Sequence, residues 1–248
     1  MFCMWIPRRS SIALLILALL AIPARGATLT VLAPASAQPG LKALAADYTA
    51  KTGAVVTVGG GSRANVLAAL KAGPADVVVL PTNDMIQLNT VSGMTPLGSI
   101  AVGVGVKAGS KVPDVSTPEK FRAVLLKAHG VAYADPAAGT SAGQAIANML
   151  NLPDFRSVKR VPVQGLAVTA LADGRADIAL QLAPELATNK AVALAGPVPQ
   201  SYGAAVDFSV GIGAVTNDAL AARDFITFIT QPANAKLWQT NGLMPLFY

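Results

Sequence analysis

The segment VAYADPAAGTSAGQAIANML, residues 131–150, holds the pattern in this chain that is most suggestive of chemistry. Its centre, Gly139 to Gly143, fits G-x-S-x-G, the turn that presents the nucleophilic serine of α/β-hydrolases. In those enzymes the histidine base follows the serine, whereas the only histidine here, His129, precedes Ser141. No S-x-x-K motif supplies a lysine base instead. We therefore expect no catalytic residue in this turn or elsewhere in the chain.

The same turn can bind an anion without catalysis. A glycine-rich turn after a strand, with Thr140 or Ser141 as the N-cap, leaves several backbone N–H groups free at the start of the next helix. Those donors and the helix dipole favour a negative charge, and Ala142 and Gly143 add no bulk. Two interpretations stay open: an anion site, or a serine that only caps its helix.

Three further strand-to-helix turns carry similar residues. Ser36 follows the first expected strand, and Ser62 with Arg63 follows the second. Gln164 and Gly165 precede a later helix. Arg63 is the only cation among these turns, and it is either a ligand for an anion or a solvated residue at a helix start. Four such turns in one α/β chain suggest a shared binding site.

Composition excludes several other classes of site. Cys3 is the only cysteine, and with a single histidine in the chain a zinc or copper site is not expected. Asp135, Asp173 and Asp177 are too dispersed for a calcium site. A P-loop is also lacking. We therefore expect neither a metal nor a cofactor.

The N-terminal segment has the features of an export signal. Arg8 and Arg9 precede an apolar run of eleven residues, 12–22, which is shorter than the about 20 residues of a membrane-spanning helix. Ala24 and Gly26 then supply the small residues of a cleavage site. We expect residues 1–26 to be a cleaved signal peptide and the mature protein to be periplasmic.

The mature chain is only mildly basic. Residues 1–26 include three arginines and no acid, so 16 of the 19 basic residues remain against 13 acidic ones, a net charge of +3. This charge is too small and too scattered to indicate nucleic acid as a partner. Without Cys3 the mature protein has no disulfide, so an ordinary apolar core must stabilise it.

Strands and helices alternate along most of the chain. Continuous Val/Leu runs such as ADVVVL, residues 75–80, are typical of parallel strands covered on both faces. Helices are indicated where apolar residues recur at helical spacing, as at Leu41, Leu44, Ala45 and Tyr48. The first series predicts strands at 28–33, 54–59 and 75–80 and a helix at 64–72. The second predicts strands at 130–133, 159–163, 176–182 and 191–196 and helices at 118–128, 141–150 and 166–173.

Two long alternating segments, 98–109 and 203–215, separate the two series. This pattern predicts two lobes, each a mostly parallel sheet flanked by helices, with the chain crossing between them twice. We expect lobe 1 to comprise residues 27–104 plus 207–248, and lobe 2 residues 105–206. Ligands of open α/β sheets bind outside the carboxyl ends of the strands, so the cleft between the lobes is the expected site.

With these residues in place, the chain resembles the molybdate-binding type of periplasmic solute-binding protein, the receptors of ABC importers with a type II two-lobed fold. The resemblance covers essentially the whole mature chain. It rests on TLTVLAPAS, LKAGPADVVVL, ADPAAGTSAGQA, ADIAL and FITFITQPANAKLWQTNGLMP. It implies a small anionic solute and an inner-membrane ABC permease as partners, and we expect a monomer.

In that family, serine hydroxyls and backbone amides from both lobes hold an oxyanion. Carried over by position, the ligands would be Ser36, Ser62 or Arg63, Ala142 and a backbone group near Gln164. Two positions depart from the family pattern. Leu182 stands where the family has a tyrosine ligand, and Arg63 adds a charge to a region that is usually neutral. The expected function is oxyanion binding, with a small organic carboxylate held by Arg63 as the alternative and a serine hydrolase at Ser141 less favoured.

The signal segment gives a first testable prediction. If residues 1–26 are removed during export, protein recovered from the exported fraction begins at Ala27. Intact-mass measurement tests this directly. A chain that retains Met1 to Gly26 in that fraction would contradict it.

Overall fold

The computed structural model of the protein describes residues 26–88 and 91–247. Apart from Gly26, the expected signal peptide lies outside these residues. The main elements, in chain order, are β1 (Thr28–Pro34), α1 (Gln38–Thr52), β2 (Val55–Gly61), α2 (Arg63–Ala72), β3 (Val77–Pro81), α3 (Thr82–Leu88), β4 (Val91–Lys107), α4 (Pro118–Lys127), β5 (Val131–Ala134), α5 (Ser141–Leu150), β6 (Arg160–Val163), α6 (Val168–Ala172), β7 (Ile178–Leu182), α7 (Ala183–Ala187), β8 (Val192–Pro197), β9 (Ala205–Gly213), α8 (Ala219–Ile229), α9 (Ala235–Thr240) and β10 (Leu243–Pro245). In the described ranges, no helix has the length and apolar character needed to cross a membrane.

The strands form one hydrogen-bonded path in the order β2-β1-β3-β9-β4-β7-β5-β6, and β8 and β10 also pair with β4. β1 is parallel to β2 and β3, and β5 is parallel to β6 and β7. The two long strands, β4 and β9, run antiparallel to their neighbours and to each other. The two parallel groups define lobe 1 (β1, β2, β3) and lobe 2 (β5, β6, β7), so the expected two-lobed α/β fold is confirmed.

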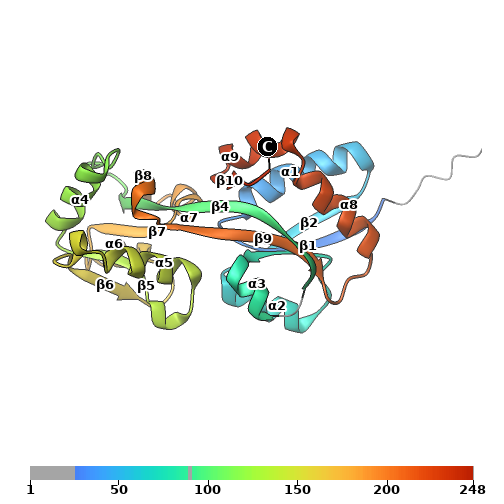
Figure 1. Cartoon of the computed structure of the whole chain (residues 1–248), viewed down its shortest axis with the longest axis horizontal. Coiled ribbons are helices and arrows are strands. Elements are labelled where there is room, and N and C mark those ends of the chain that lie inside the picture. Colours follow the sequence, from blue (N-terminus) through green and yellow to red (C-terminus); the bar gives the residue numbers. More distant parts are fainter. Residues whose placement is uncertain (1–25, 89–90, 248) are drawn as a thin grey trace, which may run out of the picture.

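Helices cover both faces of each lobe. In Figure 1, α1, α8 and α9 lie on one side of the lobe 1 strands, and α2 and α3 lie on the other. Each side has its own apolar contacts: Leu41 and Phe225 are fully buried on the first, and Val66 on the second. The cluster that holds Leu41 and Phe225 continues into lobe 2 around Phe121, and a second lobe 2 cluster gathers around Ala170. Burial on both faces is why these strands are continuous apolar runs.

β4 is longer than the sequence indicates. It begins at Val91, seven residues before the expected start at 98, because its register against β9 shifts twice and thereby accommodates Pro96 and two glycines. Gly98 also permits the contact with β10, since a Cβ atom there would lie 2.3 Å from the carbonyl oxygen of Met244. The short helices α3, α7 and α9 and strand β10 were not predicted, because they are too brief to show a periodic pattern.

The C-terminal elements pack on lobe 1. β10 pairs with β4, and Trp238 of α9 is 1% exposed, with its indole N–H donating to the carbonyl of Ile229 at 2.8 Å. Tyr48 of α1 contacts Phe225 of α8 edge to face, with ring centroids 5.1 Å apart. β4 pairs with β9 as far as Ala101 and, on its other edge, with β7 from Val102 onward. The lobe boundaries expected at 104/105 and 206/207 stay a prediction.

A buried carboxylate ties the amino end of β3 to the segment after β9. Asp76 is 1% exposed and accepts hydrogen bonds from the Thr30 N–H, the Thr216 hydroxyl and the Asn217 N–H, each at 2.8 Å. Burial alone raises the pKa of Asp76, but these hydrogen bonds together outweigh burial and hold its pKa below the ordinary value. The ionised form therefore stabilises the fold.

Asp76→Asn should lower the free energy of unfolding at pH 7 by about 2–3 kcal/mol, since hydrogen bonds to a charged group are lost. A carboxyl whose native pKa is depressed stabilises the fold above its unfolded pKa, near 4, and this contribution is lost as the pH falls through the native pKa. The difference between variant and wild type should therefore shrink at about pH 3. Urea unfolding at both pH values measures it, with the exposed Asp224→Asn as control. A deficit of equal size at both pH values would contradict this account.

Candidate functional site

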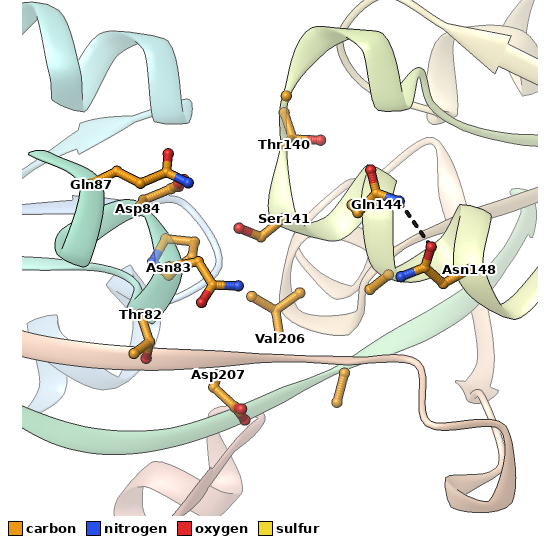
Figure 2. Close-up of a pocket in the computed structure, with 14 residues that line it drawn as sticks. Thr82, Asn83, Asp84, Gln87, Thr140, Ser141, Gln144, Asn148, Val206 and Asp207 are labelled. Carbon is orange, nitrogen blue, oxygen red and sulfur yellow. Dashed lines mark hydrogen bonds between the residues drawn. The ribbon is translucent and has the colours of Figure 1, made fainter.

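A pocket of about 400 Å³ opens between the two lobes at the crossing strand β9. Three elements line it, and Figure 2 shows them around one space: the start of α3 in lobe 1, the start of α5 in lobe 2, and β9. Half of the lining residues have polar, uncharged side chains. The lining residues are Pro81, Thr82, Asn83, Asp84, Gln87, Gly139, Thr140, Ser141, Gln144, Ala145, Asn148, Ala205, Val206 and Asp207.

The N-terminus of α5 forms the lobe 2 wall. Thr140 is the N-cap: its hydroxyl accepts from the Gly143 N–H at 3.1 Å, and its carbonyl accepts from the Gln144 N–H at 3.0 Å. The cap therefore uses the third N–H of the helix. Within the described residues, no acceptor bonds the N–H groups of Ser141 or Ala142. These two donors and the Ser141 hydroxyl remain available at the positive end of a ten-residue helix.

The geometry does not support a nucleophilic Ser141. His129 lies just before the amino end of β5, whereas Ser141 follows its carboxyl end. The His129 side chain is 57% exposed, with Nδ1 3.4 Å from Asp177 and Nε2 3.2 Å from the Gly174 carbonyl. The G-x-S-x-G pattern here marks a capped helix start.

The lobe 1 wall is held in place by two side-chain contacts. The Thr82 hydroxyl is 2.8 Å from the Ser209 hydroxyl of β9, which fixes the start of α3 against the crossing strand. Asp84 is 4% exposed and accepts from Nε of Arg63 at 2.7 Å. The Arg63 side chain is 28% exposed, and this bond uses only one of its nitrogens. Arg63 therefore contacts Asp84, which lines the pocket, but does not line the pocket itself.

Two carboxylates and no cation line the pocket among the residues that the structure describes. Besides Asp84, the other carboxylate is Asp207 of β9, which is exposed and accepts from the Ser99 hydroxyl of β4 at 2.5 Å. Asn83 and Gln87 on α3 face the side of α5 that carries Ser141 (Figure 2). Asp84 is paired with Arg63, and the Asp207 side chain lies on the opposite side of β9 from Val206 (Figure 2), so neither carboxylate is a free charge beside Ser141.

The predicted lobe 1 ligands lie at the carboxyl ends of β1 and β2. A hydrogen bond of 2.7 Å from the Ala35 N–H to the Gly61 carbonyl ties these two turns together. Ser36 is 1% exposed, and its hydroxyl has no hydrogen-bond partner among the residues that the structure describes. Ser62 is exposed and caps α2 by accepting from the Asn65 N–H at 3.1 Å.

The predicted lobe 2 ligands lie at the carboxyl ends of β5, β6 and β7. Ala142 is half-buried on α5, and Gln164 is exposed, with its amide donating to Asp135 at 2.9 Å. Leu182 is 5% exposed at the end of β7. Of the seven residues predicted from the sequence, only Ser141 lines the pocket. A ligand role for Ser36, Ser62, Arg63, Ala142, Gln164 and Leu182 stays a prediction.

The sequence analysis missed most of the pocket lining. Thr82, Asn83 and Asp84 follow β3 in a strand-to-helix turn of the same kind as the four singled out, so the same rule identifies them. Gln144 and Asn148 are one helical turn apart on α5 and bond each other at 2.8 Å. No group of three or more His, Cys, Asp or Glu residues in the described part of the chain is arranged to hold a metal ion.

Comparison with known proteins identifies the family. Residues 29–244 match the model of the bacterial extracellular solute-binding proteins. The chain belongs to this family. It is thus a bacterial solute-binding protein, as its resemblance to the periplasmic solute-binding proteins implied.

Three relatives illustrate the range of the fold. Aconitate isomerase from Pseudomonas sp is 25% identical over 258 residues, covering 97% of this chain and 98% of its own. The periplasmic molybdate-binding protein of Azotobacter vinelandii superposes with a TM-score of 0.58 at 18% identity, covering 87% and 98% of the two chains. PEB3 of Campylobacter jejuni, solved with L-phospholactate bound, superposes with a TM-score of 0.61 at 17% identity, covering 86% and 98%. The similarity to the two solved structures shows the fold alone.

The partnership of Arg63 and Asp84 can be measured by a double-mutant cycle on the free energy of unfolding. We expect Arg63→Ala and Asp84→Ala to be coupled by about 1–3 kcal/mol, because Asp84 is buried and Arg63 largely so. The exposed pair Lys120–Asp114, also 2.7 Å apart, is the matched control and should show less than about 1 kcal/mol. Equal coupling free energies in the two pairs would contradict a stabilising ion pair between Arg63 and Asp84.

Proposed function

We propose that the mature protein is a monomeric periplasmic receptor that binds a small anionic solute between its lobes and delivers it to an inner-membrane ABC permease. A cleaved signal peptide at residues 1–26 would export it. The proposal extends the family assignment in the negative charge of the solute, the monomeric state, the ABC permease as partner and the cleavage of residues 1–26.

The observation that carries the proposal is the pair of free N–H groups on Ser141 and Ala142. Ser141 lines the pocket at the positive end of α5, and Ala142 is the next residue of the same helix turn. A helix N-terminus of this length with unused donors favours an acidic group of a ligand. An anion bound here would sit opposite Asn83 of lobe 1, so that both lobes contact it.

Lobe 1 adds two supporting features. A buried hydroxyl without a hydrogen-bond partner is unfavourable. A solute that accepts a hydrogen bond from the Ser36 hydroxyl when the lobes close would remove this cost. Arg63 keeps donors beyond the one used by Asp84, and a guanidinium fork suits a carboxylate. The three relatives described above also agree with this, since molybdate, L-phospholactate and aconitate are all anions.

We infer binding without chemical turnover. Among the described residues, the pocket lining holds no histidine, and its two carboxylates are bonded to Arg63 and Ser99 instead of Ser141. Incubation with an activated ester and with cis-aconitate should leave both unchanged. Conversion that is abolished by a substitution in the pocket lining would overturn this part of the proposal.

A pair of substitutions at Ser141 tests the proposed anion site. Ser141→Pro removes the backbone N–H and the hydroxyl, and proline suits the first helical position because Thr140 already has extended backbone (φ −85°, ψ 137°). Ser141→Ala removes the hydroxyl alone. By calorimetry with molybdate, phosphate, citrate and cis-aconitate as probes, Ser141→Pro should weaken the tightest probe by about tenfold or more, and by more than Ser141→Ala does.

Two results would contradict the proposed site. One is an anion that binds wild type and Ser141→Pro equally well. The other is a probe set in which only neutral or cationic solutes bind. Urea unfolding of both variants serves as the control, since each should retain the wild-type stability to within about 1 kcal/mol.

A further inference from the structure

The start of α2 in lobe 1 is built in the same way as the start of α5 in lobe 2. The Ser62 hydroxyl accepts from the third N–H of α2 at 3.1 Å, as the Thr140 hydroxyl does in α5. The first two N–H groups of α2, those of Arg63 and Ala64, have no acceptor among the described residues. Each lobe therefore presents two free N–H groups at the positive end of a ten-residue helix.

Two side chains add further donors at the start of α2. Arg63 donates through Nε to Asp84 at 2.7 Å, and its two terminal nitrogens have no partner among the described residues. Ser36 adjoins the same place, because the N–H of its neighbour Ala35 donates to the Gly61 carbonyl at 2.7 Å. The Ser36 hydroxyl is buried and lacks a partner in the described part of the chain. A guanidinium and an unused buried hydroxyl point to an acidic ligand independently of the helix dipole.

The two helix starts are separate binding places. The pocket at the start of α5 is lined by Asp84, which bonds Arg63, but by none of the donors at the start of α2. A small oxyanion held by α5 therefore lies one side chain short of the guanidinium. A longer solute can reach past Asp84, whose charge is offset by Arg63 and so repels an acid little.

We propose that the solute carries two acidic groups, one bound by the N–H groups of Ser141 and Ala142 and the other by Arg63 and the start of α2. This inference rests on the proposed function and names its substrate class. The volume of about 400 Å³ lies in the range of sites for small organic molecules and exceeds what one inorganic oxyanion fills. Asp84 is a positioning residue, because its bond to Nε leaves the terminal nitrogens of the guanidinium free for a carboxylate.

Matched pairs of acids test the inference. Butyrate and succinate, pentanoate and glutarate, and hexanoate and adipate differ, within each pair, only in a terminal methyl or carboxylate group. By calorimetry, the diacid of at least one pair should bind at least about tenfold more tightly than its monoacid, because hydrogen bonds to a charged group are added. The pair with the largest ratio reports the spacing of the two acidic groups.

Three variants assign the two ends of the diacid. Arg63→Met combined with Asp84→Leu removes both charges, so no carboxylate is left buried alone, and should reduce the ratio to less than about threefold. Arg63→Lys keeps a cation beside Asp84 without the guanidinium fork and should give an intermediate ratio. Ser141→Pro should weaken both acids of a pair, since it acts on the carboxylate that they share. Lys71→Ala, in the last turn of α2, is the control and should leave the ratio unchanged.

Each other outcome overturns the inference. Equal binding within all three pairs contradicts the second acidic group while leaving the anion site of the proposed function intact. Binding of molybdate with none of the diacids likewise retains the proposed function and rejects this substrate class. A diacid preference that survives removal of both Arg63 and Asp84 rejects Arg63 as the residue that binds the second group. An equal loss of both acids in that variant would mean that the pair only shapes the site at α5.

Discussion

The antiparallel pairing of β4 with β9 joins the two lobes and fixes where the solute site lies. β9 pairs with β3 and β4, and β4 continues past it to pair with β7 and β8. Two extended strands therefore connect the lobes, with no separate linker. Such a pair resists sliding, because every residue of slip would exchange the two faces of the strands. The same pair can bend, and bending is the motion that would bring α3 and α5 together.

The rest of the site follows from this arrangement. Because the strands within each lobe are parallel, all of their helix-leading turns gather at one edge of that lobe. Placing the lobes on either side of β9 sets α3 opposite α5 across the strand (Figure 2). The anchors are specific: Thr82 contacts Ser209, Asp84 holds Arg63, and Thr140 caps α5. These contacts fix the polar groups before any solute arrives, which reduces the entropy lost on binding.

Local patterns in the sequence predicted the fold class and most elements, because buried parallel strands appear as unbroken Val/Leu runs. They missed the first part of β4, where Pro96 and Gly98 look like breakers until the register shifts are known. The free amides of α5 could be predicted, since a capped glycine-rich turn is local chemistry. The Arg63–Asp84 pair could not, because it joins residues 21 positions apart through tertiary packing. Nor could the place of Asp207, which depends on the pairing of β9.

A crystal structure of the mature protein grown with its tightest-binding solute tests the central claim most directly. The account predicts closed lobes, an acidic group of the solute accepting from the N–H groups of Ser141 and Ala142, and contacts from α3 on the opposite side. A solute bound to one lobe only, or bound away from the start of α5, would contradict it.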